Sequence, residues 1–242
     1  MKHLTSIQVL GDSILKGIQL DQETGKYHTE NHIGVEEFGR RYGVTIRNDS
    51  RFGCTVLKGE RLLNRMLDRG LCCDAVVMDF GGNDCDFNWT EVAADPGGEH
   101  LPHVSLEEFT VTYRRMIRRL KEREILPILT TLPPLEPQWF FDWWCRDLDK
   151  AKVLEWLGDV HNIYAHQENS SRRVERLARE EDVPLVDVRG TFLDYGHLEE
   201  LICADGTHPN SRGQACITQA FLDFGDRYHL AVERSGETGK AE

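Results

Sequence analysis

Residues 7–13 read Ile-Gln-Val-Leu-Gly-Asp-Ser, a short apolar run followed directly by small and polar residues. The short, mostly aliphatic run Ile7–Leu10 predicts a strand buried on both faces, and the strand stops at Gly11. Asp12 and Ser13 follow at once, at the carboxyl end of the expected strand. We expect Ser13 to lie where this strand turns into a helix, with an exposed hydroxyl near the helix N-terminus.

Further along the chain, similar short apolar runs alternate with patterns typical of helices. The runs predict four more strands, at Val44–Ile46, Ala75–Phe80, Ile125–Thr131 and Pro184–Val188. Apolar residues spaced by three and four indicate helices around residues 62–67, 106–120, 160–178 and 217–224. Strands that alternate with helices predict an α/β fold, a parallel sheet of about five strands with helices on both faces.

Length, charge and cysteine content limit the class of protein. The 242 residues suit one domain, which we place at residues 1–232, with 233–242 as a frayed tail. A net charge of −12 argues against nucleic acid as a partner. The sequence has no CxxC pair and no apolar stretch long enough to span a membrane, and because no long apolar run follows Lys2 we expect no signal peptide. We therefore expect a cytoplasmic protein with reduced thiols. The sequence does not distinguish a monomer from a homo-oligomer.

Four groups of small and polar residues stand at the ends of predicted strands. The first is Gly11–Ser13, the second contains Gly53, the third is Gly81–Asp84, and the fourth is Asp205–His208. Because parallel strands end at the same edge of a sheet, we expect these groups to meet there. Each group alone is also common in turns or helix caps. The evidence for a functional site is therefore that all four groups occur in order, each at the end of a predicted strand.

The residue types in these groups suit ester hydrolysis. Ser13 is the candidate nucleophile, His208 can act as its base, and Asp205 lies three residues earlier, where it can orient His208. The backbone N–H groups of Ser13 and Gly53, with the side-chain amide of Asn83, are the candidate oxyanion donors. We interpret the carboxylates of Asp12 and Asp84 as loop supports; metal binding is the minor alternative, because no His/carboxylate ligand spacing accompanies them.

These motifs resemble those of the SGNH hydrolase superfamily, also called GDSL-type lipases and esterases. The matching residues are Gly-Asp-Ser at 11–13, Gly53, Gly-x-Asn-Asp at 81–84 and Asp-x-x-His at 205–208. Ile14 stands where the family usually has Leu. The resemblance implies a three-layer α/β/α, flavodoxin-like fold and a carboxylic ester substrate, and the chemistry needs no metal or organic cofactor.

An aromatic segment at residues 139–144 bears on the substrate. Two long stretches without a predicted strand or helix, 84–104 and 133–149, follow the third and fourth predicted strands. Trp139, Phe140, Trp143 and Trp144 lie in the second of these stretches, and Trp89 lies in the first. These side chains can form a wall over the catalytic edge and bind substrate. A packing cluster or a dimer contact explains them equally well.

The sequence thus predicts an enzyme that cleaves a small acetyl or short-acyl ester of a sugar or a lipid-like alcohol, through an acyl-enzyme on Ser13. A thioesterase or a lysophospholipase can use the same residues. The contrasting classes are a catalytically silent α/β binding module and a flavodoxin-like cofactor binder.

Overall fold

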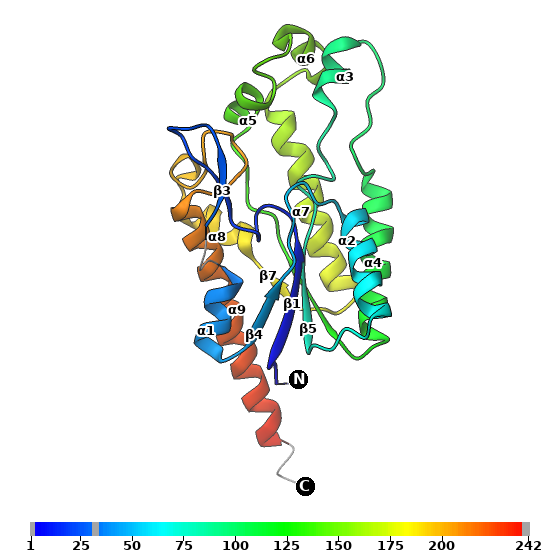
Figure 1. The fold of residues 1–242 in the computed structure, drawn as a ribbon, viewed down its shortest axis with the longest axis vertical. Helices are drawn as coiled ribbons and strands as arrows, with labels where there is room; N and C mark the ends of the chain where they lie inside the picture. Colours follow the sequence, from blue (N-terminus) through cyan, green and yellow to red (C-terminus); the bar gives the residue numbers. More distant parts are fainter. Residues whose placement is uncertain (1–2, 31–33, 239–242) are drawn as a thin grey trace.

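The computed structural model describes residues 3–30 and 34–238 and confirms the α/β/α fold (Figure 1). One sheet contains five parallel strands in the order β4–β1–β5–β6–β7. Their bounds are β1 (Ser6–Gly11), β4 (Thr45–Asn48), β5 (Ala75–Asp79), β6 (Leu126–Thr130) and β7 (Leu185–Val186). This is the flavodoxin-like order, in which the chain reverses direction across the sheet between β1 and β5. The loops after these two strands carry Ser13 and Asn83.

Helices cover both faces of the sheet (Figure 1). One face packs against α2 (Val56–Asp68), α4 (Leu106–Lys121) and α7 (His161–Glu180). The other packs against α1 (Val35–Tyr42), α8 (Val188–Tyr195) and α9 (Ser211–Thr238). The side chains of β5 alternate between the two cores, with Val76 and Met78 on the first side and Val77 on the second. The sheet is therefore buried on both faces, as its aliphatic strands indicate.

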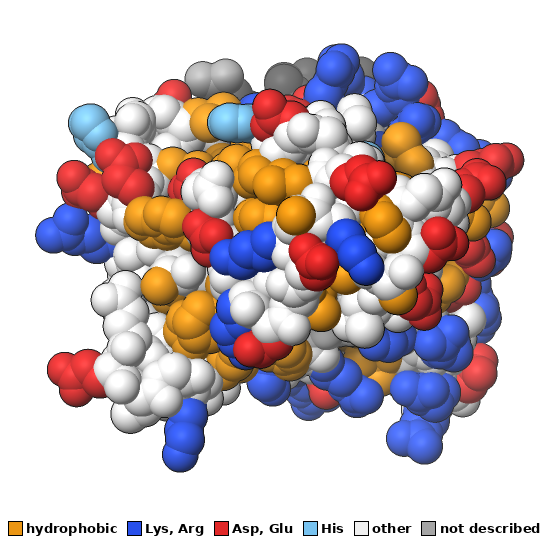
Figure 2. Space-filling model, turned by 90° about the horizontal axis from the view of Figure 1, so that it is seen from above, with side chains coloured by type: hydrophobic (Ala, Val, Ile, Leu, Met, Phe, Trp, Pro, Cys, Tyr) orange, Lys and Arg blue, Asp and Glu red, His pale blue; other side chains and the backbone are white. Residues whose placement is uncertain are grey.

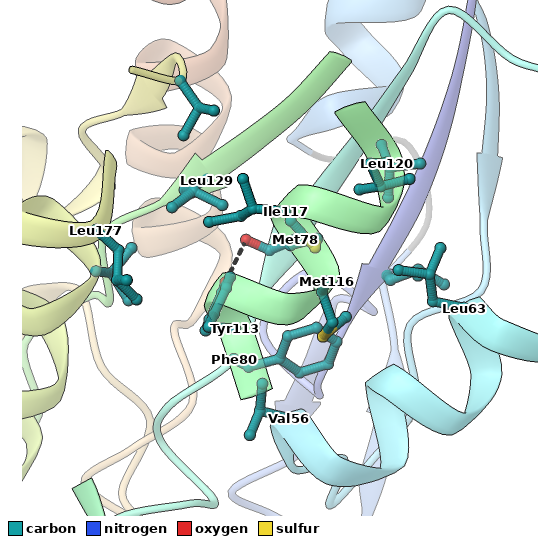
Figure 3. Packing of buried hydrophobic residues seen from close by; sticks show 14 of the residues in the cluster. Val56, Leu63, Met78, Phe80, Tyr113, Met116, Ile117, Leu120, Leu129 and Leu177 are labelled. Carbon is teal, nitrogen blue, oxygen red and sulfur yellow. Dashed lines mark hydrogen bonds between the residues drawn. The ribbon is translucent and has the colours of Figure 1, made fainter. Parts of the chain in front are cut away.

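The first core is tightly packed where α2 and α4 meet the sheet (Figure 3). Tyr113 of α4 is fully buried, and its hydroxyl donates to the carbonyl oxygen of Met78 at 2.9 Å. Gly59 of α2 lies against the ring of Phe80, which would be 2.2 Å from a Cβ at that position. These contacts fix the end of β5, from which the loop with Asn83 departs.

A third apolar cluster lies above the carboxyl edge of the sheet (Figure 1). It joins the short helices α3 (Trp89–Ala94), α5 (Pro137–Trp144) and α6 (Lys150–Leu157) to the first turns of α7. Helices α3 and α5 lie within residues 84–104 and 133–149, the two long stretches for which the sequence predicts neither a strand nor a helix. Another addition is the antiparallel hairpin of β2 (Ile18–Leu20) and β3 (Tyr27–Thr29).

The expectation that a helix begins at Ser13 is wrong. Residues 13–17 form turns, in which Lys16 N–H donates to the Asp12 carbonyl and Ile18 N–H to that of Ser13. Gly17 has a φ of 75°, a left-handed conformation, and the chain enters β2 directly afterwards. The Ser13 N–H is therefore part of a tight turn and has no helix dipole behind it.

At the other end of the chain, α9 extends into the segment that we expected to be frayed. Its helical backbone includes residues 233–238, whereas residues 239–242 lie outside the described part of the chain. The division into a domain of residues 1–232 and a tail stays a prediction.

Candidate active site

Ser13, His208 and Asp205 form a continuous hydrogen-bonded chain. The Oγ of Ser13 lies 2.9 Å from Nε2 of His208, and Nδ1 of His208 lies 2.6 Å from Oδ2 of Asp205. All three side chains are buried, with exposed fractions of 6%, 3% and 0%. This geometry suits a neutral imidazole that donates from Nδ1 and accepts the Ser13 proton at Nε2.

Asp205 is held as a carboxylate by the loop in which it lies. Its Oδ1 accepts the N–H groups of Thr207 at 3.1 Å and His208 at 3.0 Å. Burial raises the pKa of Asp205, but the hydrogen bonds from His208 and Thr207 and the charge interaction with His208 outweigh it, so the net pKa is below its ordinary value. The short Asp-x-x-His turn thus supplies both the orientation and the charge that the imidazole needs.

Gly206 lets α5 approach this loop. It has a φ of 74°, and a Cβ there would lie 2.1 Å from the backbone N of Phe140. Its carbonyl accepts the N–H of Glu136 at 2.8 Å, at the start of α5. The close approach puts Phe140 beside the loop of Asp205 and His208.

The candidate oxyanion donors lie around Ser13. Asn83 Nδ2 donates to Oδ2 of Asp12 at 3.0 Å and has a long contact of 3.4 Å with the Cys54 carbonyl. Because the second contact is weak, that N–H can turn to an oxyanion in the pocket. The backbone N–H groups of Ser13 and Gly53 have no acceptor among the residues with described positions. Gly53 has a φ of 66°, which explains the glycine in this motif.

A pocket of about 170 Å³ opens in front of the triad. Its walls contain residues from three of the four sequence motifs and from α5; among them are Asp12, Ser13, Asn83, Thr207, His208, Phe140 and Trp144. Gly53 itself does not line the pocket, but its neighbour Phe52 does. The strand-end residues predicted from sequence therefore do come together at one edge of the sheet.

The predicted aromatic substrate-binding residues divide into two groups. Phe140 and Trp144 line the catalytic pocket, and Trp89 lines a smaller pocket next to it. Trp139 and Trp143 instead line a separate surface groove, together with residues of the β2–β3 turn. We therefore retain Phe140, Trp144 and Trp89 as substrate-binding candidates and exclude Trp139 and Trp143 from the catalytic pocket.

Two aromatic residues that sequence reasoning missed enclose His208. The ring of Phe52 stacks on the imidazole, with centroids 5.6 Å apart and planes at 21°. Tyr27 of β3 packs on the same imidazole at 5.2 Å. Burial and then the nearby charge of Asp205 raise the pKa of Tyr27, so it stays a neutral phenol. Phe52 directly precedes Gly53, so the second motif could have pointed to it, whereas no motif marks Tyr27 and only the hairpin brings it here.

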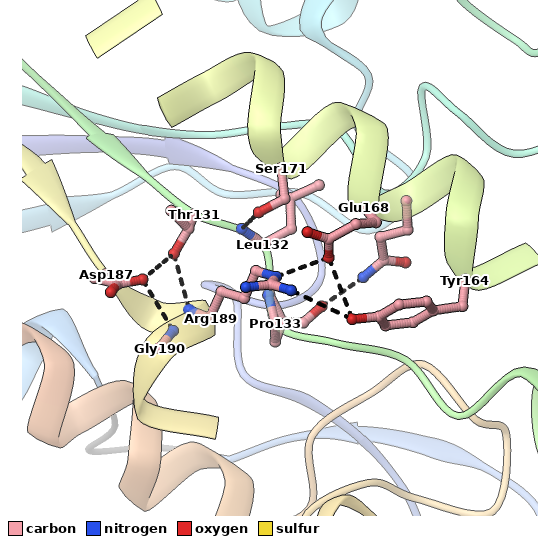
Figure 4. A network of polar contacts seen from close by, with 10 residues as sticks. Thr131, Leu132, Pro133, Tyr164, Glu168, Ser171, Asp187, Arg189 and Gly190 are labelled. Atoms are coloured by element: carbon pink, nitrogen blue, oxygen red, sulfur yellow. Dashed lines mark hydrogen bonds and ion pairs between the residues drawn. The ribbon is translucent and has the colours of Figure 1, made fainter. Parts of the chain in front are cut away.

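The end of β6 forms another wall of the pocket and is fixed by polar contacts with α7 (Figure 4). The N–H of Leu132 donates to Oγ of Ser171 at 3.2 Å, and the Gln167 amide donates to the carbonyl of Pro133. These bonds satisfy backbone groups just past the strand. The wall is therefore rigidly placed opposite Ser13.

Three buried carboxyl groups, of Asp12, Asp79 and Asp84, lie behind the oxyanion donors. Asp12 supports the local loop as expected, accepting the N–H of Ile14 at 2.8 Å as well as the Asn83 amide. Asp84 accepts the N–H of Val56 at 2.8 Å. Burial raises the pKa of Asp79 to about 6 and that of Asp84 to about 7.

This burial predicts a pH-dependent cost of Asp84 to stability. Because the pKa of Asp84 is higher in the native state than in the unfolded state, the native state binds the proton more tightly. Protonation of Asp84 therefore stabilises the fold at low pH, and this stabilisation is lost as pH rises from about 4 through about 7. Asp84→Asn lacks this pH dependence. The difference in unfolding free energy between Asp84→Asn and the wild type should therefore shift in favour of the variant by on the order of 2–4 kcal/mol from pH 4 to pH 8. Urea unfolding of both proteins at several pH values measures this; parallel curves would contradict it.

The described residues contain no helix long and apolar enough to cross a membrane. Nor do they contain a group of three or more His, Cys, Asp or Glu side chains placed to hold a metal ion. The end of the molecule above the sheet has hydrophobic side chains in patches between charged ones, with both signs of charge present (Figure 2).

A parallel α/β sheet that carries a Ser–His–Asp chain at its carboxyl edge is an arrangement characteristic of hydrolases. Residues 9–216 match the model of the GDSL-like lipase/acylhydrolase family, and the chain belongs to this family. The protein is therefore a carboxylic ester hydrolase, and the resemblance to SGNH hydrolases is confirmed. No curated protein sequence matches the chain.

Solved structures show the same fold. The lipase/acylhydrolase from Enterococcus faecalis has a TM-score of 0.65 and 18% identity, covering 93% of this chain and 97% of that one. LAE5, an alpha/beta hydrolase from the metagenome of Lake Arreo, Spain, has a TM-score of 0.63 and 23% identity, covering 92% and 95%. A catalytic mutant of Axe2, an acetylxylan esterase from Geobacillus stearothermophilus, has a TM-score of 0.62 and 20% identity, covering 93% and 96%.

Proposed function

We propose that the protein hydrolyses a small carboxylic ester by forming an acyl-enzyme on Ser13. The hydrogen-bonded chain from Ser13 through His208 to Asp205, at the wall of a pocket, carries this proposal. His208 takes the proton from Ser13 as Oγ attacks the ester carbonyl, and it then gives this proton to the departing alcohol. Water subsequently attacks the acyl-enzyme with His208 again as base, which releases the acid and restores Ser13.

The tetrahedral intermediate of each step carries a negative oxygen. In the proposed mechanism the N–H groups of Ser13 and Gly53 and the Asn83 amide donate to it. Asp12 holds one N–H of that amide, so Asn83 keeps its position without substrate. Donors placed in advance stabilise the transition state without a cost of reorganisation during the reaction.

Asn83→Ala should therefore lower kcat about 100- to 1000-fold and change KM only a few-fold, because the donor acts mainly on the transition state. Steady-state kinetics with p-nitrophenyl acetate measure both constants. Asn64→Ala is the matched control, because Asn64 lies on α2 and its amide oxygen accepts from Arg119, away from the pocket. An unchanged kcat with a raised KM would assign Asn83 to substrate binding.

The size of the pocket favours a short acyl group. The cleft of about 170 Å³ is closed by Leu132, Pro133, Phe140 and Trp144. In a series of p-nitrophenyl esters, kcat/KM should be highest for acetyl to butyryl and at least ~10-fold lower for dodecanoyl, because a long chain has no buried surface to occupy. A steady rise of kcat/KM with chain length would instead favour a lipase or lysophospholipase. Acetyl thioesters in the same assay separate an esterase from a thioesterase.

A further inference from the structure

The catalytic pocket continues into a second, smaller compartment of about 20 Å³. The two pockets share five lining residues: Gly82, Asp86, Phe140, Gln167 and Thr207. Beyond this shared zone the inner pocket is largely apolar, with Phe87, Trp89, Leu135 and Ile163 in its walls. Its volume has room for little more than one water-sized group. A substrate in the catalytic pocket therefore meets the polar side chains of the shared zone, while the smaller pocket next to it can take only a small group.

Asp86 is the charged group of this zone, and its carboxylate is fixed. Oδ1 accepts the indole N–H of Trp89 at 2.9 Å, while the backbone carbonyl of Asp86 accepts the N–H of His103 at 2.8 Å. No side chain within the described ranges donates to Oδ2. Burial raises the pKa of Asp86 to about 6, against the N–H of Phe87 and the charge of His103, which lower it. At pH 7 and above, the carboxyl group is thus mainly ionised, and its oxygens have capacity to accept further hydrogen bonds.

Two further polar groups face the same zone. Gln167 is 8% exposed and uses its amide N–H on the Pro133 carbonyl, which leaves its side-chain oxygen as an acceptor. Thr207 adds a hydroxyl, which can donate or accept. In addition, the buried indole N–H of Trp144, a residue of the catalytic pocket, has no acceptor in the described part of the chain.

We propose that Asp86, together with Thr207 and Gln167, recognises hydroxyl groups of the substrate, so that the preferred esters are those of polyhydroxylated alcohols. The proposal rests on the proposed esterase function of the same pocket. A hydroxyl donates to the carboxylate of Asp86 and replaces the water lost on binding. An aliphatic chain in that place leaves a desolvated carboxylate without a donor, which is unfavourable. Of the two kinds of alcohol that the sequence motifs allow, this proposal favours the sugar-like alcohols over the lipid-like ones.

Two acetate esters of nearly equal size test this proposal. Glycerol monoacetate and propyl acetate share the acyl group and a three-carbon alcohol, and they differ by two hydroxyl groups. The wild type should have the higher kcat/KM for glycerol monoacetate. In Asp86→Asn the ratio of the two kcat/KM values should fall about 10-fold, because glycerol monoacetate loses the charged acceptor and the penalty for burying propyl acetate against a carboxylate is relieved. Asp142→Asn is the control and should keep the wild-type ratio, because Asp142 is an exposed residue of α5 that pairs with Lys150 of α6 and lines neither pocket.

The pH dependence of this kcat/KM ratio distinguishes substrate recognition by Asp86 from a purely structural role of this residue, which would not make the ratio depend on pH. Asp12, Cys85, His103, His166 and His208 are the other titratable groups around the two pockets or near Asp86. Titration of the triad affects both esters alike and cancels in the ratio. The wild-type ratio should therefore fall as pH drops through about 6, whereas that of Asp86→Asn should stay flat.

The outcomes separate this proposal from the esterase function itself. An unchanged ratio in Asp86→Asn overturns hydroxyl recognition while ester hydrolysis stands. A stronger preference for acetylcholine than for glycerol monoacetate also overturns it, because Asp86 would then recognise a cation. If Asp86→Asn does not fold, Thr207→Val decides by the same ratio, which should fall several-fold. A folded wild type that hydrolyses none of the three esters contradicts the proposed function instead.

Discussion

Ser13→Ala should abolish ester turnover, with kcat reduced by roughly 10⁴- to 10⁶-fold. Without Oγ no acyl-enzyme forms, and only direct attack by water remains. The side chain is 6% exposed and makes one hydrogen bond, to Nε2 of His208, so its loss should leave the fold intact. The measurement is kcat for p-nitrophenyl acetate, with thermal unfolding of both proteins as the check on folding. A folded Ser13→Ala that retains a tenth of the wild-type kcat would exclude Ser13 as nucleophile.

His208→Ala should have an effect of similar size, with kcat falling by about 10⁴-fold or more. The substitution removes the group that accepts the Ser13 proton and leaves Asp205 buried without its main partner. His161→Ala is the control, because His161 is exposed at the start of α7 and contacts Asp159. Equal losses in the two variants would refute His208 as the base. Because an unpaired Asp205 can destabilise the loop, Asp205→Ala/His208→Ala serves as a second test.

The sheet and the triad could be predicted from sequence because both depend on short local patterns. Runs such as Ile7–Leu10 are short, mostly aliphatic and end at a glycine, which favours a buried strand, and parallel strands end at one edge of the sheet. Any strong polar motif after such a strand then lies at this edge, whatever the intervening loops do. This is why Ser13 and His208, which are 195 positions apart, were predicted to meet.

The details near Ser13 could not be predicted in the same way. The hairpin strands have three residues each, too few to show an alternating pattern, and Gly17 ends the turn before a helix can form. Tyr27 reaches His208 through this hairpin, and Phe52 reaches it from the loop after β4. The raised pKa values of Asp79 and Asp84 likewise come from burial, which single residues do not reveal.

In the aromatic segment 139–144, the helix α5 determines which side chains can contact the substrate. Pro137 in its first turn favours a helix, and α5 has the spacing that follows. In a helix, residues four apart share a face, so Phe140 and Trp144 point to the catalytic pocket while Trp139 and Trp143 line the other groove. Read as a loop, the same residues form one undivided wall. The helix therefore decides which aromatic residues are candidates for substrate contact.

Covalent labelling of the nucleophile tests the account most directly. A fluorophosphonate reacts with a serine that is activated by a neighbouring base, and mass spectrometry of the digested protein locates the adduct. We expect one adduct per chain, on the peptide that contains Ser13, with no labelling of Ser13→Ala and much slower labelling of His208→Ala. A folded wild type without an adduct at Ser13, or a Ser13→Ala variant labelled as fast as the wild type, would contradict the proposed mechanism.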